Sequence, residues 1–127
     1  WGKERTLKKI LVIDDQRTIR ELVRAALRSA PLQILQAASG EEGVELARQQ
    51  IPDLVLLDIM LPEGIDGFEV ARTLKQDPRT RDIPIVALTA KVQQTDREEA
   101  FRAGMDEYLA KPFGLQELRQ KIKQFLG

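Results

Sequence analysis

The stretch Ile10-Leu11-Val12-Ile13-Asp14-Asp15 joins four consecutive apolar residues to two adjacent carboxylates. An apolar run without alternation indicates a strand that is buried on both faces, as in a parallel sheet covered by helices. Similar runs follow along the chain, and three of the four strongest lack a period of two. We therefore expect strands over residues 10–13, 32–35, 54–57 and 85–88, and a weaker strand over 107–110.

Segments with helical spacing separate these runs. Apolar residues recur three and four positions apart over 19–30 and again over 115–125, so each set lines one face of a helix. Ser39 and Thr95 are each followed three residues later by Glu, which matches a capping box and predicts two further helix starts. Strand and helix thus alternate five times, which predicts a doubly wound α/β sheet with right-handed crossovers.

Composition limits the possible functions. The 127 residues suit one domain spanning 1–127, and the balance of 20 basic and 20 acidic residues argues against bulk electrostatic binding to nucleic acid or anionic lipid. No apolar stretch approaches the roughly 20 residues that span a bilayer, and no signal-peptide pattern opens the chain, so we expect a cytoplasmic domain. Because the chain begins with Trp1 rather than Met, we expect a processed chain or a piece of a longer one.

The chain has no cysteine and no histidine. This excludes disulfides, thiolate metal sites, the usual zinc ligands and a Ser-His-Asp triad. Any chemistry must come from carboxylates, hydroxyls, lysines and backbone groups.

Polar residues gather at the ends of the predicted strands. Asp14 and Asp15 follow the first strand, Asp58 the third, Thr89 the fourth, and Lys111 comes after the fifth. In a doubly wound sheet the ligand site lies beyond these carboxyl ends. Three carboxylates without histidine repel one another and need a cation, and oxygen ligands alone suit Mg²⁺. One such Asp could equally be a turn former or helix cap, but the whole set at one edge favours a functional site.

Four motifs in order and spacing resemble the receiver domain of two-component response regulators, including the chemotaxis regulators. They are Ile10–Asp15, Leu56–Pro62 with Asp66-Gly67, Ala87–Ala90 and Tyr108–Phe113, and the likeness covers nearly the whole chain. The resemblance implies the flavodoxin-like strand order 2-1-3-4-5. It also implies a phosphoacceptor that catalyses its own phosphorylation and dephosphorylation rather than a turnover enzyme.

The resemblance assigns roles to the acidic residues. Asp58 would accept the phosphoryl group from the phosphohistidine of a histidine kinase or histidine phosphotransfer protein. Asp15 and Asp58 would bind Mg²⁺ directly, together with the backbone carbonyl of Met60, and Asp14 would act mostly through a bound water. The segment from Met60 to Gly67 is one residue longer than the common pattern, and Gly64 could absorb the extra residue at positive φ.

The resemblance also implies a switch. Lys111 would pair with the phosphoryl oxygens, Thr89 would hydrogen-bond to one of them, and Tyr108 would change rotamer as Thr89 moves. The affected surface would be formed by the fourth helix, the fifth strand and the fifth helix, which supports a phosphorylation-dependent dimer. On the last helix we expect this surface to carry three basic residues, namely Arg119, Lys121 and Lys123. We expect no small-molecule cofactor, no membrane contact and no direct contact of this domain with nucleic acid.

Other interpretations remain open at this point. One is a phosphorelay intermediate or phosphate sink without its own output, and another is a degenerate receiver that only binds partners. A flavin carrier on the same fold would need a loop rich in Ser, Thr and Gly after the first strand, where the sequence has Asp14-Asp15-Gln16-Arg17. A phosphohydrolase with an aspartyl-phosphate intermediate usually needs a second acid two residues past its nucleophile, where this chain has Met60.

Overall fold

Five strands and five helices alternate along the chain in the computed structural model, which describes residues 7–90 and 93–126. Among these residues no helix is long and apolar enough to cross a membrane. The elements are β1 (Lys8–Ile13), α1 (Arg17–Ala26), β2 (Leu32–Ala37), α2 (Gly40–Gln50), β3 (Leu54–Asp58), α3 (Gly67–Gln76), β4 (Ile85–Thr89), α4 (Gln94–Arg102), β5 (Glu107–Ala110) and α5 (Leu115–Leu126).

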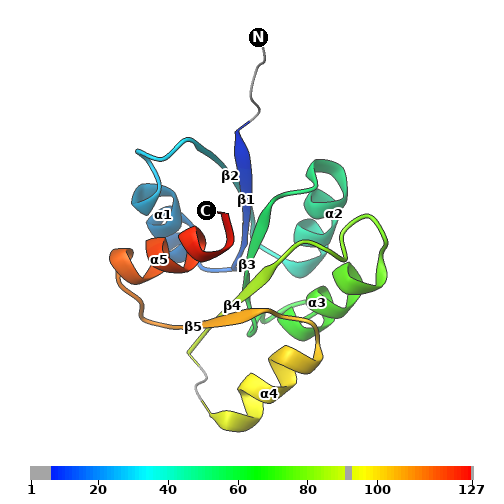
Figure 1. Ribbon diagram of the computed structural model, residues 1–127. Helices are drawn as coiled ribbons and strands as arrows, with labels where there is room; N and C mark the ends of the chain where they lie inside the picture. Colours follow the sequence, from blue (N-terminus) through cyan, green and yellow to red (C-terminus); the bar gives the residue numbers. More distant parts are fainter. Residues whose placement is uncertain (1–6, 91–92, 127) are drawn as a thin grey trace.

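The strands form one parallel sheet in the order β2-β1-β3-β4-β5, as predicted (Figure 1). Because all strands point the same way, their carboxyl ends lie along one edge of the sheet. The strand order reverses between β1 and β3, which is where this fold leaves a crevice for ligands.

Two layers of helices bury the two faces of the sheet. Leu11 and Ile13 of β1 pack with the residues of α2, α3 and α4, whereas Ile10 and Val12 pack with those of α1 and α5. These four side chains have no exposed surface, which explains why the run lacks alternation. Full burial of each such side chain contributes about 1.5–3 kcal/mol. β2 lies at the edge of the sheet and is mostly half-buried, which explains why Gln33 is tolerated there.

The first helix is shorter than its apolar spacing predicted. α1 ends at Ala26, and the N–H groups of Arg28 and Ala30 donate to carbonyls three residues back, in turns rather than in a continued α-helix. Pro31 keeps the helix from continuing through Ala30, because proline disfavours helical backbone in the residue before it. Leu27 nevertheless stays buried with the α1 residues.

One of the two predicted helix starts is confirmed. Ser39 Oγ accepts from the N–H of Glu42 at 3.2 Å, so α2 begins where expected. The prediction for Thr95 is wrong, because α4 begins at Gln94 with Gln93 as its N-cap. The Gln93 side chain makes no cap hydrogen bond, and its backbone carbonyl accepts the N–H groups three and four residues on.

The loop between β3 and α3 is held from both ends. Gly64 adopts φ +73°, as predicted for the extra residue, and the N–H of Ile65 donates to Glu41 Oε2 of α2 at 3.0 Å. Asp66 caps α3 by accepting from the Glu69 N–H at 2.9 Å. A Cβ at Gly67 would collide with the backbone at the end of β3, so glycine lets α3 start directly beneath that strand.

Candidate functional site: an acidic cluster with one lysine

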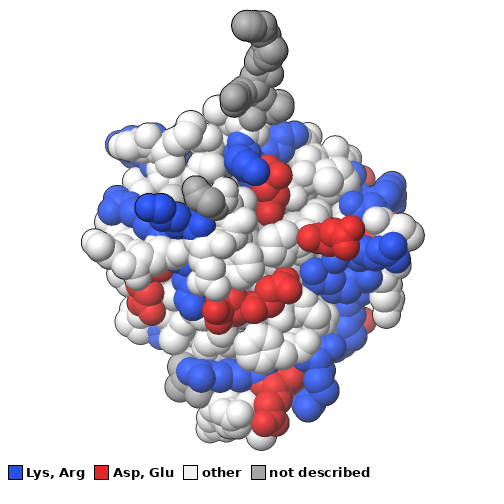
Figure 2. All heavy atoms as spheres, in the orientation of Figure 1, with Lys and Arg blue, Asp and Glu red and all other residues white. Residues whose placement is uncertain are grey.

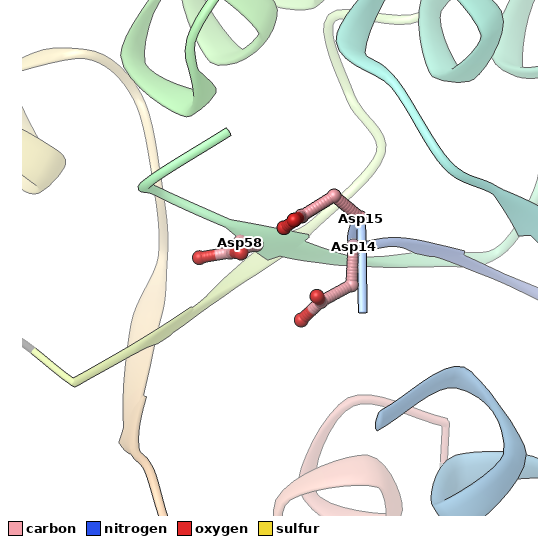
Figure 3. A group of neighbouring side chains, drawn as sticks. All are labelled: Asp14, Asp15 and Asp58. Atoms are coloured by element: carbon pink, nitrogen blue, oxygen red, sulfur yellow. The ribbon is translucent and has the colours of Figure 1, made fainter. Parts of the chain in front are cut away.

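Three carboxylates converge at the carboxyl edge of the sheet. Asp14 and Asp15 follow β1, and Asp58 is the last residue of β3, the neighbouring strand. One oxygen from each lies within 4.8 Å of the other two (Figure 3). Asp14 is 0% exposed and Asp58 is 4% exposed, whereas Asp15 is exposed to solvent. The predicted cluster therefore forms, with two of its acids buried and one at the surface.

Lys111 reaches into this cluster from the loop after β5. Its Nζ lies 2.8 Å from Asp14 Oδ2, 3.5 Å from Asp58 Oδ2 and 3.3 Å from Gln16 Oε1. Its backbone N–H donates to the Thr89 carbonyl at 2.8 Å, which ties the loop to the end of β4. The lysine was predicted beside Asp58, and the structure adds a shorter contact with Asp14.

The groups around the Asp58 carboxylate shift its pKa in opposite directions. Burial raises the pKa of Asp58 above its ordinary value, and the nearby Asp14 raises it further. The Met60 N–H, which donates to Asp58 Oδ1 at 3.0 Å, acts in the opposite direction, and so does Lys111. The protein therefore stabilises the negative charge of ionised Asp58 only in part, and an added cation would supply further positive charge.

Thr89 and Met60 flank the cluster. Thr89 ends β4 and is fully buried, one residue beyond Leu88, which pairs with Asp58 in the sheet. Met60 exposes about half of its side chain, and its N–H is the group that faces Asp58. Both predicted residues therefore lie at the same edge as the three acids.

Tyr108 is buried in this structure. Its side chain is 9% exposed and packs in the core on the α4 side of the sheet, where the Arg97 guanidinium lies 5.0 Å from the ring centroid. Burial raises the pKa of Tyr108, although Arg97 lowers it. Among the residues that the structure describes, its hydroxyl has no hydrogen-bond partner. A ring in this state has a polar group that would gain from turning outward.

The basic residues of α5 do not share one surface, contrary to the prediction. Lys121 pairs with Glu107 of β5 at 3.2 Å, so it belongs to the α4–β5–α5 side. Arg119 Nε instead donates to the Ala26 carbonyl of α1 at 2.9 Å, and Lys123 lines a cavity beside α1. Arg119 and Lys123 are four residues apart and share one flank of the helix, whereas Lys121, two residues from each, lies on another flank.

Two polar residues near the site were not predicted. The Gln16 N–H donates to Asp14 Oδ1 at 2.9 Å, and its side chain accepts from Lys111. Arg20 Nη1 donates to the Asp14 carbonyl at 2.8 Å, while its Nε reaches Gln36 Oε1 of β2 at 3.2 Å. Arg20 could have been found from its place four residues after Gln16, one helical turn from the acids.

The donor set fits a hard divalent cation. Its ligand atoms are carboxylate oxygens, and one ammonium faces three carboxylates, which leaves negative charge uncompensated. Mg²⁺ prefers such oxygen donors and binds through one or two carboxylates plus phosphate. A doubly wound α/β domain with an acidic cluster and a lysine at this edge has the parts of a phosphoacceptor signalling domain.

Comparisons with known proteins place the chain in a family. Residues 10–123 match the response regulator receiver domain. The DNA-binding dual master transcriptional regulator RpaA of Synechocystis is 42% identical over 120 residues, covering 94% of this chain and 49% of that protein. The chain thus spans about half the length of this relative. It belongs to the family of response regulator receiver domains.

Two solved structures resemble the fold. Vibrio cholerae chemotaxis protein CheY4 superposes with a TM-score of 0.89 at 26% identity, covering 95% of this chain and 100% of that one. The receiver domain of the sensor histidine kinase PA1611 from Pseudomonas aeruginosa has a TM-score of 0.85 at 35% identity, covering 94% and 98%. That receiver holds a magnesium ion in its active-site cleft. The chain is accordingly a two-component phosphoacceptor signalling domain, and the relay or sink alternative is not favoured.

Proposed function

We propose that Asp58 is the residue that accepts the phosphoryl group. The observation that carries this proposal is its position: Asp58 lies beside the acids that follow β1 and 3.5 Å from the ammonium of Lys111, at the end of a central strand. A carboxylate oxygen of Asp58 attacks the phosphorus of a phosphohistidine. The new P–O bond forms as the P–N bond breaks, and the electron pair of that bond returns to the imidazole nitrogen of the donor.

The acidic residues would hold Mg²⁺. Asp15 and Asp58 supply carboxylate oxygens, Met60 supplies its backbone carbonyl, and Asp14 acts through a bound water. When bound, the ion supplies positive charge that neutralises the phosphoryl oxygens. Support comes from the under-compensated charge of the cluster and from the raised pKa of Asp58.

Lys111 and Thr89 would stabilise the transferred group. Lys111 Nζ already lies 3.5 Å from Asp58 Oδ2, so a small movement away from Asp14 brings the ammonium onto a phosphoryl oxygen. Thr89 would donate its hydroxyl to another oxygen. Its backbone carbonyl holds the Lys111 N–H, so the two groups respond together.

The phosphoryl group would act on the surface of α4, β5 and α5 through Tyr108. A shift of Thr89 toward the phosphate would empty space at the end of β4 and change the balance between the buried and outward rings. This surface would then bind a partner or a second copy of the domain. In the cytoplasm, the donor would be a histidine kinase or histidine phosphotransfer protein, and this domain would not itself contact nucleic acid.

The assignment of Asp58 can be tested without the cognate kinase. Phosphoramidate with Mg²⁺ should add one phosphoryl group to the wild-type chain, measured by intact mass, and EDTA should prevent it. Asp58→Asn should abolish the addition because an amide cannot form the acyl phosphate. Asp82→Asn, which changes an exposed acid in the loop before β4, is the matched control and should label normally. Persistent labelling of the Asp58→Asn variant would show that another residue is the acceptor.

A further inference from the structure

A recess lies at the opposite edge of the sheet from the acidic cluster. It has a volume of about 520 Å³ and is bounded by the carboxyl ends of α1 and α5 and the amino ends of β1 and β2. Its floor is apolar and is formed by Ala26, Leu27, Pro31, Leu32, Ile122 and Leu126. This volume falls within the range of about 300–1,000 Å³ that small-molecule sites occupy.

The end of α1 creates this recess. The helix ends at Ala26, and Leu27, Ala30 and Pro31 line the recess as the chain passes on to β2. Arg119 Nε bridges the two helices through the Ala26 carbonyl at 2.9 Å, which fixes their separation at this point. The recess is therefore built by the backbone and by one anchored side chain, and its apolar floor is not covered by any described residue.

The charged residues that line the recess are all positive among those described. Lys8, Arg119 and Lys123 line the recess, and no carboxylate does so among the residues described. Of the two adjoining grooves, the one between α1 and β2 has Arg24 and Arg28 and no described acid, and the one that shares Lys8 has Lys9 and Asp53. Figure 2 shows blue side chains gathered around the carboxyl end of α5, in a chain whose total charge is zero.

Helix ends do not account for all of these cations. The carboxyl ends of α1 and α5 each carry a partial negative charge of about half an elementary charge. Three full positive charges on the lining exceed these two halves, so the recess keeps a net attraction for an anion. The apolar floor, by contrast, offers nothing to a bare inorganic anion.

We propose that this recess binds an amphiphilic carboxylate, a free acid whose apolar body fills the floor while its carboxylate meets Lys8 and Lys123. The alternatives fit less well. A nucleic acid would use the cations but would leave the apolar floor empty, and a neutral lipid would use the floor but would not require the cations. The recess shares no residue with the acidic cluster, so this site is independent of the phosphoacceptor function.

The test uses three small molecules that distinguish the contribution of the apolar chain from that of the carboxylate. Decanoate should bind saturably at one site and shift the methyl resonances of Leu27, Leu32 and Ile122 in ¹H–¹³C spectra, leaving Leu88 near the acidic cluster unchanged. Decanol has the same body without charge, and acetate has the charge without the body. We expect decanol to bind at least about tenfold more weakly than decanoate, a difference of about 1.4 kcal/mol in binding free energy. Acetate should cause no saturable shift.

Charge variants complete the test. Lys8→Glu combined with Lys123→Glu, both exposed positions, should weaken decanoate binding about fivefold or more, the order measured for partly exposed ion pairs. Arg72→Glu reverses an exposed charge on α3 and should leave the affinity unchanged. Asp58→Asn should also bind decanoate normally, so a failure of this proposal is distinct from a failure of the phosphoacceptor assignment. Equal binding of decanol and decanoate, or shifts outside the recess, would overturn the proposal.

Discussion

The ammonium of Lys111 lies 2.8 Å from Oδ2 of Asp14, a carboxylate with no exposed surface. The same ammonium is 3.5 Å from Asp58 Oδ2, so one cation is shared unequally between two buried acids. In the metal-free protein this lysine is the nearest positive charge that the described residues supply to the cluster. Its contact with Asp14 therefore stabilises the metal-free protein. Binding of Mg²⁺ and a phosphoryl group would change how the ammonium is shared between Asp14 and Asp58.

Lys111→Met should destabilise the metal-free protein. The substitution leaves Asp14 and Asp58 buried without a compensating charge, and losing one partner of a buried pair costs about 3 kcal/mol. We expect urea denaturation in EDTA to show a lower unfolding free energy, with partial recovery in MgCl₂ as the added cation takes over the compensation. Lys123→Met removes an exposed lysine far from the cluster and should change little. Equal stability of the two variants in EDTA would contradict the shared-cation interpretation.

Asp15→Asn should have the opposite effect on stability in EDTA. Asp15 is exposed and lies close to two other carboxylates, so removing its charge relieves repulsion without breaking a buried contact. We expect a gain of about 0.5–1 kcal/mol, the order of a screened surface charge pair. Mg²⁺ titration should show weaker binding by the same variant. Asp82→Asn removes an exposed acid elsewhere, and a similar gain in that control would attribute the effect to total charge.

Asp77, at the end of α3, should contribute to the loss of stability of the fold in acid. Arg79 pairs with it at 3.0 Å and Arg48 of α2 at 3.1 Å, and hydrogen bonds from Arg79 first, then Arg48, hold the pKa of Asp77 well below 3.8. A lowered folded-state pKa means that this stabilisation is present above pH 3.8 and is lost as the pH falls further.

Asp77→Asn should therefore lower Tm at pH 7 and flatten the decline of Tm below pH 4. Thermal melts from pH 7 to pH 2 measure both effects on one variant. A parallel decline in the variant and the wild type would mean that the two arginines do not stabilise the ionised carboxylate.

The fold was predictable because the apolar pattern of whole strands and helices is visible in the sequence. Uninterrupted burial of β1, β3 and β4 removes the period of two, and that absence is visible in the sequence. Helix ends were less predictable. Gln93 caps α4 with its backbone carbonyl, which every residue has, so no side chain marks it, whereas the suggestive Thr95 lies inside the helix.

The site was predictable as a set of residues but not as a set of contacts. Strand ends bring Asp14 and Asp58 together, since neighbouring parallel strands end at the same edge. The preference of Lys111 for Asp14 depends on how a flexible side chain crosses from the β5 loop, which spacing does not encode. Likewise, Arg97 reaches the Tyr108 ring only because α4 packs beside β5.

Tyr108→Phe should separate the stability of the domain from its signalling. In the present state the hydroxyl is buried and lacks a partner among the described residues, so its removal should raise the unfolding free energy by about 1 kcal/mol. The Arg97 guanidinium can still lie over a phenyl ring, so the local packing remains. Denaturant melts of the unphosphorylated proteins measure this effect.

The same variant should respond incompletely to beryllofluoride, a mimic of the phosphoryl group. In the wild type we expect amide shifts at Thr89 and Tyr108 and along α4 and α5, because an outward ring gives its hydroxyl access to water. In Tyr108→Phe the shifts around Asp58 should persist while those in α4 and α5 shrink, since a phenyl ring gains nothing by leaving the core. Wild-type shifts confined to the loops around Asp58 and Lys111 would identify the domain as a phosphate sink or relay instead of a conformational switch.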